Sequence, residues 1–178
     1  MIPEEDIAQM LKTAWLPKRA CRKDTECRLT LFQEDEGLDP DLRHAIEHHE
    51  ELIHYFSRTN VMLPHVGQSY NLTYAIVRSL VLLGYPAKVC HLLDLLDPPE
   101  TRAGINFQQG LSDCKMLAIL GFYESTEAKP TATPRITYQL NQLECDYLLV
   151  TDEVLDGQTW WPQELIASFG EAHYLNRP

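Results

Sequence analysis

The chain has 178 residues, of which 44% are hydrophobic and 23% charged, a balance typical of a folded globular protein rather than a disordered one. Its net charge of −11 disfavours non-specific DNA binding, which depends on basic side chains that neutralise phosphates. Five cysteines without a CxxC pair disfavour a disulfide framework and a structural zinc site. No signal peptide or membrane-length apolar stretch is present, so we expect a cytoplasmic protein without membrane contact.

Residues 3–14 are expected to form a short helix, because apolar residues recur on one face and acidic residues occupy the first turn. A basic, irregular segment follows at 17–30, and its cations stand close to Trp15: Lys18, Arg19, Arg22 and Lys23. Aromatic and arginine side chains together are typical of protein interfaces. We favour a protein partner for this segment, with nucleic acid as the alternative that the net charge opposes.

Residues 39–57 are expected to form the next helix, with Asp39 or Asp41 as its cap. His44 and His48 lie four positions apart on one helix face, and Glu47 and Glu51 are adjacent. That spacing can chelate a divalent ion, so these histidines are the best metal candidates in the sequence. A solvated polar face without metal is the reading we favour, and we expect no bound metal or cofactor.

The rest of the chain alternates between strand and helix patterns. We expect strands at 60–64, 87–92 and 146–151, and helices at 70–83, 93–97, 135–144 and 162–174. Gly84 is expected to be the C-cap of the helix at 70–83. Residues 116–123 fit either a strand or a buried helix, 100–115 are ambiguous, and 124–134 read as a loop. This alternation predicts a three-layer α/β fold with a mostly parallel sheet, preceded by a helical and basic segment, so that the division is 1–58 and 59–178.

Two segments have the layout of a P-loop nucleotide site. Asp152 and Glu153 follow an apolar strand, as the metal-organising and water-polarising carboxylates of P-loop ATPases do. The strand at 60–64 leads into a helix through a loop that keeps only Gly67 of the expected glycines. A phosphate loop also needs a Lys, and none occurs between Arg58 and Arg78. The sequence therefore predicts a site arranged for ATP but without the residues that bind its phosphates. The alternative for Asp152 and Glu153 is that they end a strand and begin a turn without a functional role.

Trp160 and Trp161 are neighbours near the end of the chain, so at most one of them is expected to face the core. Either Trp160 staples the last helix, or the pair supplies an exposed binding hot spot. Both readings stay open at this stage.

Several segments occur in an order that resembles a known family: the helix at 72–80, Gly84-Tyr85 before a strand, Leu93-Asp94-Leu95-Leu96, and the run from Leu140 to Glu153. In this order they resemble the DnaC/IstB-type helicase loaders and transposition helpers of the AAA+ superfamily, over a little under half the chain. The resemblance implies a P-loop NTPase-like core and contact with a replicative helicase or a related AAA+ ATPase. Truncated loader-like proteins of this sort suit a phage or another mobile element.

The sequence departs from that family at three places. The family's Lys and Thr would fall at about Ser69 and Tyr70, and a bulky Tyr stands where phosphate should sit. The family's next strand has no room before Pro178, and no lid domain follows. We therefore expect a non-catalytic interaction protein that binds and modulates a replication or transposition ATPase. The alternatives are a divalent-metal-dependent hydrolase or ATPase using Asp152 and Glu153, and a nucleic-acid adaptor using residues 12–28.

Overall fold

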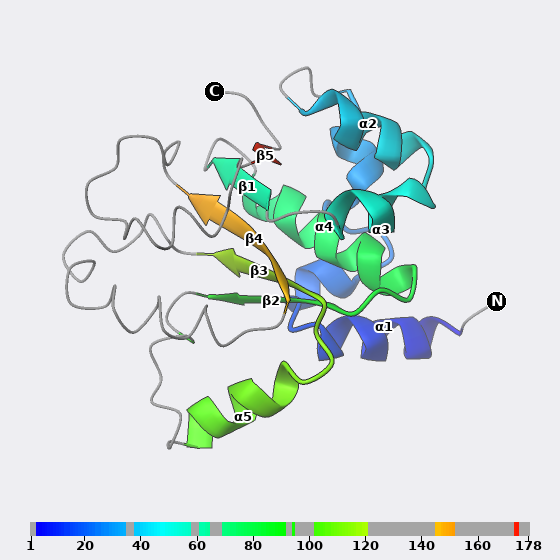
Figure 1. Ribbon diagram of the computed structural model, residues 1–178. Helices are drawn as coiled ribbons and strands as arrows, with labels where there is room; N and C mark the ends of the chain where they lie inside the picture. Colours follow the sequence, from blue (N-terminus) through cyan, green and yellow to red (C-terminus); the bar gives the residue numbers. More distant parts are fainter. Residues whose placement is uncertain are drawn as a thin grey trace, which may run out of the picture.

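The computed structural model describes residues 3–34, 38–57, 61–64, 69–91, 94, 102–120, 145–151 and 173–174 (Figure 1). Its centre is a parallel five-stranded sheet in the order β2-β3-β4-β1-β5. The strands are β1 (Val61–Pro64), β2 (Ala87–His91), β3 (Met116–Leu120), β4 (Asp146–Thr151) and β5 (His173–Tyr174). All four pairings are parallel, and Figure 1 shows the arrowheads of β1 to β4 pointing toward one edge. The predicted α/β class with a parallel sheet flanked by helices is confirmed.

The helix α4 (Ser69–Leu82) is the central helix of the fold. It contacts β2, β3 and β4 on one side and α1 (Glu4–Thr13), η1 (Lys18–Cys21) and η2 (Leu29–Phe32) on the other. Leu72, Ile76 and Leu80 on it are 3% exposed or less, as expected for a helix between two layers. Gly84 has φ +83° and Tyr85 N–H bonds to Leu80 O at 2.9 Å, which is a Schellman C-cap and confirms the predicted end of this helix.

The N-terminal segment packs on the same core as the sheet. One cluster of buried residues includes Leu11 and Ala14 near α1, Leu42 and Leu52 further along, and the buried face of α4. The backbone also joins the two parts, because Val89 N–H on β2 bonds to Ala14 O at 3.1 Å. The division of the chain at 58/59 stays a prediction, and the described residues on its two sides share this cluster.

The expected single helix over 39–57 is wrong. The structure has two helices, α2 (Pro40–Glu47) and α3 (Glu51–Phe56), with His48 leaving helical geometry at φ −113° and ψ 82°. Every residue from 47 to 51 is exposed, so no apolar side chain ties this stretch to the core. The break lets the buried residues on each side, such as Ile46 and Leu52, reach the core separately.

Two further expectations concern the later elements. The run at 116–123, left open between strand and helix, forms β3 over 116–120 with all five residues buried, and α5 (Arg102–Gly110) occupies the ambiguous stretch before it. The predicted helix 162–174 is wrong at its end, because His173 and Tyr174 form β5 beside Val61 and Met62. A short strand does follow β4 before Pro178, and it pairs with the open edge of β1.

No helix among the described residues is long and apolar enough to cross a membrane. The expected helices at 93–97 and 135–144 and the loop at 124–134 lie wholly or mostly outside the described residues. The same is true of Gly67, Asp152, Glu153, Trp160 and Trp161.

Candidate functional site

The carboxyl ends of β1 and β4 meet at one edge of the sheet. The register pairs Pro64 with Thr151, the last residues of the two strands. The loop containing Gly67 and the pair Asp152 and Glu153 follow these residues directly in the sequence. Ligands of open parallel sheets bind at this edge, outside the carboxyl ends of the strands. The structure thus brings together the two strands that carry the predicted halves of the site, although the halves themselves lie outside the described residues.

The first turn of α4 follows this edge and lacks a cationic side chain. Ser69 opens the helix and Tyr70 comes next, as the sequence comparison with a phosphate loop anticipated. Tyr70 is half-buried, and its ring lies 6.3 Å from that of Tyr74 one turn later. An aromatic ring therefore packs in the turn where P-loop proteins place the metal-binding hydroxyl.

A pocket with a volume of about 500 Å³ opens beside this turn. Side chains from six parts of the fold line it: the segment after α1, α4, β2, Asp94 beyond the end of β2, α5 and β3. Its walls include the aromatic residues Trp15, Tyr70, Tyr74 and Phe107. Pockets of this size with mostly apolar walls and a few polar groups are typical ligand or side-chain binding sites. Sequence reasoning missed this pocket, because its residues are spread from position 15 to 120 and no local pattern joins them.

Trp15 forms one wall of the pocket and is held from several sides. Its backbone has φ 62°, a left-handed conformation that costs a bulky residue about 1–2 kcal/mol. The ring stacks on Phe107 at 5.6 Å, and the Lys88 ammonium lies 4.7 Å from its centroid. Gly110 makes room for it, since a Cβ there would lie 2.3 Å from Trp15 Cζ2. These contacts hold the Trp15 ring in position in the absence of a ligand.

The polar groups in the pocket do not suit phosphate. Among the described residues that line it, His91 and Asp94 are the side chains of the acidic and basic residue types, and no Lys or Arg is among them. The Asp94 carboxylate accepts a hydrogen bond from the His91 backbone N–H at 3.0 Å. A carboxylate in the wall repels phosphate, so the described lining favours an apolar or aromatic group over a triphosphate.

The basic segment predicted to bind a partner lies on the surface, and part of it is used inside the molecule. Lys18, Arg19, Arg22 and Lys23 are all exposed. Arg19 donates hydrogen bonds to Asn71 Oδ1 and to Cys27 Sγ, and its guanidinium lies 5.0 Å from the Tyr74 ring centroid. Arg19 therefore ties η1 to the first turns of α4.

Lys23 forms an exposed ion pair with Glu4 at 3.0 Å, which contributes little to stability because water screens it. The ion pair leaves both side chains on the surface, with exposures of 87% and 76%. Lys18, Arg22 and Arg28 are the other exposed cations of this segment. Residues 18–23 thus present exposed cations although the chain as a whole is acidic.

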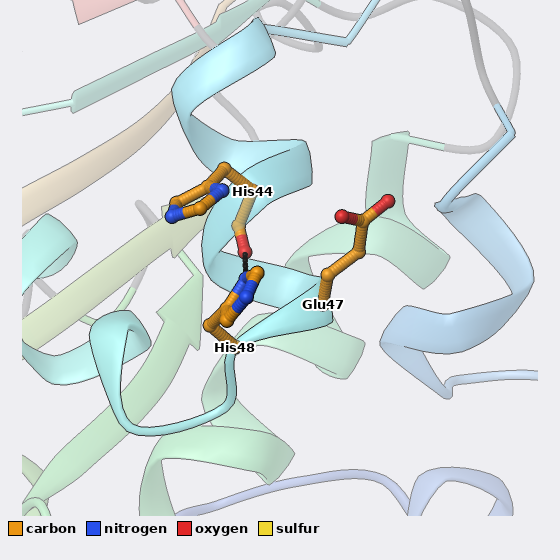
Figure 2. Close-up of side chains that lie close together, drawn as sticks. All are labelled: His44, Glu47 and His48. Atoms are coloured by element: carbon orange, nitrogen blue, oxygen red, sulfur yellow. Dashed lines mark hydrogen bonds between the residues drawn. The ribbon is translucent and has the colours of Figure 1, made fainter.

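The predicted metal candidates do come together. His44 and His48 stack with ring centroids 4.3 Å apart, and the Glu47 carboxylate joins them at the end of α2 (Figure 2). All three side chains are exposed. Glu51, the other acidic neighbour named from the sequence, belongs to α3 and is not a member of this group.

The cysteines of the described residues are free thiols. Burial raises the pKa of Cys90 well above its ordinary value, so this thiol stays protonated although it lines the pocket. Cys114 and Cys145, which precede β3 and β4, share a hydrogen bond that lowers the pKa of Cys114 and raises that of Cys145. They lie at the amino ends of their strands, away from the edge that carries the candidate site.

Solved structures of DnaA are similar to this chain. AMPPCP-bound DnaA from Aquifex aeolicus matches with a TM-score of 0.53 and 16% identity, over 81% of this chain and 49% of that chain. The replication initiator DnaA bound to AMPPCP and single-stranded DNA matches with a TM-score of 0.53 and 14% identity, over 80% of this chain and 48% of that chain. The chain thus spans about half the length of these proteins.

No protein-family model and no curated protein sequence matches the chain. At the identities found with DnaA, structural similarity establishes the fold and not the activity. The chain therefore has an α/β fold similar to that of the DnaA structures over most of its length.

Proposed function

We propose that this chain is a non-catalytic AAA+-like protein of DNA replication, which binds a replicative helicase or a related AAA+ ATPase and modulates it. The observation that carries the proposal is the first turn of α4. It follows β1 at the ligand-binding edge of the sheet, and it begins with Ser69, Tyr70 and Asn71. A P-loop protein places there the Lys that neutralises the β- and γ-phosphates and the hydroxyl that holds Mg²⁺.

The packing of Tyr70 supports the loss of nucleotide chemistry. Its ring is half-buried against Tyr74 and lines the pocket, so it occupies space beside the helix start. Phosphoryl transfer depends almost entirely on positioning and on neutralising charge. A helix start without an ammonium group cannot supply that charge, and the similarity to replication initiators supports a role in the same process without turnover.

The aromatic pocket is the docking site in this proposal. Its occupant is an apolar or aromatic side chain that projects from the helicase or ATPase. Trp15 and Phe107 are fixed against each other before binding, which reduces the entropy lost on association. Exposed Lys18 and Arg22 follow Trp15 in the chain and offer a basic rim for an acidic surface on the partner.

Equilibrium binding of labelled ATP with Mg²⁺ tests the non-catalytic half of the proposal. We expect any dissociation constant to be weaker than about 1 mM. The double variant Ser69→Lys with Tyr70→Thr restores the two missing groups and should bind ATP better than the natural chain. Micromolar binding by the natural chain that is lost in Asp152→Ala would defeat the proposal.

Binding to the purified replicative helicase of the source cell tests the partner half. Asn106 is exposed and lines the pocket, so Asn106→Arg should obstruct it without disturbing the core. We expect this variant to weaken helicase binding about tenfold or more, whereas Gln109→Arg, an exposed position on the same helix outside the lining, should leave it unchanged. No retention of the natural chain at micromolar helicase, or equal effects of the two variants, contradicts the proposed docking site.

A further inference from the structure

The last turn of α2 and its C-cap present three potential metal ligands on the surface. His44 and Glu47 belong to the helix, and His48 is the residue at which it ends. One ligand atom from each side chain can be chosen so that all three lie within 4.8 Å of one another. Figure 2 shows the three side chains around this helix end. They come from a single turn, so no distant part of the fold has to move for them to converge.

One hydrogen bond settles which nitrogen of His48 is available. Nδ1 of His48 lies 3.1 Å from the backbone oxygen of His44, drawn as the dashed line in Figure 2. A carbonyl oxygen can only accept, so Nδ1 must carry the proton in this bond. In the neutral ring the lone pair is then on Nε2, which is free to bind a metal. Metal-binding histidines commonly have this arrangement, with the second ring nitrogen donating to a carbonyl or carboxylate.

Glu47 is held in place by a neighbour and keeps an oxygen available. Gln33 Nε2 donates to Glu47 Oε1 at 3.3 Å, and the carboxylate has a second oxygen. The helix end also favours a cation, because the carbonyl groups of the last turn carry partial negative charge. Position, tautomer and local field therefore all favour a positive ion at this point.

We propose that His44, Glu47 and His48 form a binding site for a divalent transition cation such as Zn²⁺, Co²⁺ or Ni²⁺. Two imidazole nitrogens and one carboxylate oxygen suit these ions, whereas Mg²⁺ and Ca²⁺ prefer oxygen ligands throughout. Ligand atoms on one such ion lie about 3–3.5 Å apart, given metal–ligand bonds of about 2 Å. Small rotations of exposed side chains close the remaining gap, and water completes the coordination.

The bound ion has a structural consequence at the junction between α2 and α3. His48 is the residue where the chain leaves the first helix, and the second begins at Glu51. An ion bound to His44 and His48 links the helix to its own C-cap and holds the break in one conformation. Because the ion binds only the folded arrangement of three ligands, it also raises the stability of the protein.

Titration of the purified chain with ZnCl₂, followed by calorimetry and by the visible spectrum of the Co²⁺ form, tests the site. We expect one ion per chain with micromolar affinity, a higher melting temperature, and Co²⁺ bands without thiolate charge transfer. His44→Ala and His48→Ala should each lower the affinity about tenfold or more, and Glu47→Gln should lower it less. His54→Ala is the matched control, because His54 is an exposed helical histidine outside the group.

Three outcomes overturn the proposal: no Zn²⁺ binding at micromolar concentration, undiminished binding by both His44→Ala and His48→Ala, or a Co²⁺ spectrum dominated by sulfur ligands. A circular dichroism spectrum matching that of the natural chain shows that each variant is folded, as expected for exposed positions. The measurement uses the metal alone and does not depend on helicase or nucleotide binding, so its result is separate from that of the proposed function.

Discussion

The first turn of α4 and the last turn of α2 are two helix ends with opposite chemistry. The N-terminus of a helix attracts anions and the C-terminus attracts cations. At α4, which lies at the ligand-binding edge of the sheet, Tyr70 is half-buried and no lysine is present. At α2, on the surface, exposed His44, Glu47 and His48 gather where a cation is favoured. The position of a helix end in the fold therefore does not decide by itself which ion it can hold, because the side chains of its terminal turn also contribute.

The difference in burial between these helices predicts the largest effect. Leu80 on α4 is fully buried, so Leu80→Ala should lower the free energy of unfolding by about 3 kcal/mol through lost burial and a cavity. His44→Ala, at an exposed position of α2, should change it by no more than about 0.5 kcal/mol without metal. Urea unfolding of both variants measures the two values. A cost below about 1 kcal/mol at Leu80 would mean that α4 is not the buried centre of the fold.

The fixed wall of the pocket predicts the second effect. Gly110→Ala places a Cβ 2.3 Å from Trp15 Cζ2, so the ring must shift, at a cost of about 2 kcal/mol. An alanine otherwise favours a helix, and the neighbouring exposed Gln109→Ala should be nearly neutral. Chemical denaturation and helicase binding are measured together. A stabilised Gly110→Ala variant with normal binding would show that Trp15 is not held as the pocket requires.

The N-cap of α2 predicts a third effect, at the opposite end of the helix that carries His44. Asp39 accepts from Leu42 N–H at 3.2 Å and from the Tyr55 hydroxyl at 3.1 Å. Asp39→Ala removes both bonds and should cost about 1–2 kcal/mol, whereas Asp39→Asn keeps an acceptor oxygen and should cost less. Thermal unfolding compares them. Equal losses in the two variants would indicate that the charge rather than the cap is what matters.

The smallest effect is expected at Asp146, which begins β4 at the amino edge of the sheet. Burial raises the pKa of this carboxyl above its ordinary value of 3.8, so ionisation at neutral pH opposes folding. This penalty is absent below the unfolded-state pKa and grows as pH rises through the folded-state pKa. Asp146→Asn should therefore be slightly more stable at pH 7, and the gain should shrink as the pH falls below about 4. Unfolding at both pH values checks the sign, and a variant less stable at neutral pH reverses it.

Local sequence patterns were sufficient to predict the elements whose conformation is decided by residues close to one another in the sequence. The apolar spacing of α4 and the glycine after it predicted the helix and its left-handed C-cap at Gly84. The apolar runs typical of buried strands predicted the bounds of β1, β2 and β4 to within one residue. The spacing of His44 and His48 placed both rings on one helix face, because that separation is close to one helical turn.

Long-range packing decided the rest. The break between α2 and α3 depends on packing against the core. The pairing of His173 with Val61 depends on the backbone groups at the open edge of β1. The pocket brings Trp15, Tyr74 and Phe107 together from three separate elements, and the left-handed backbone of Trp15 is tolerated only because the surrounding contacts compensate for it. Sequence alone determined α4 with its C-cap, the strands β1, β2 and β4, and the missing lysine, since these are properties of a few consecutive residues. The tertiary structure alone decided which side chains share a wall, because that depends on how the helices and strands pack once water is excluded.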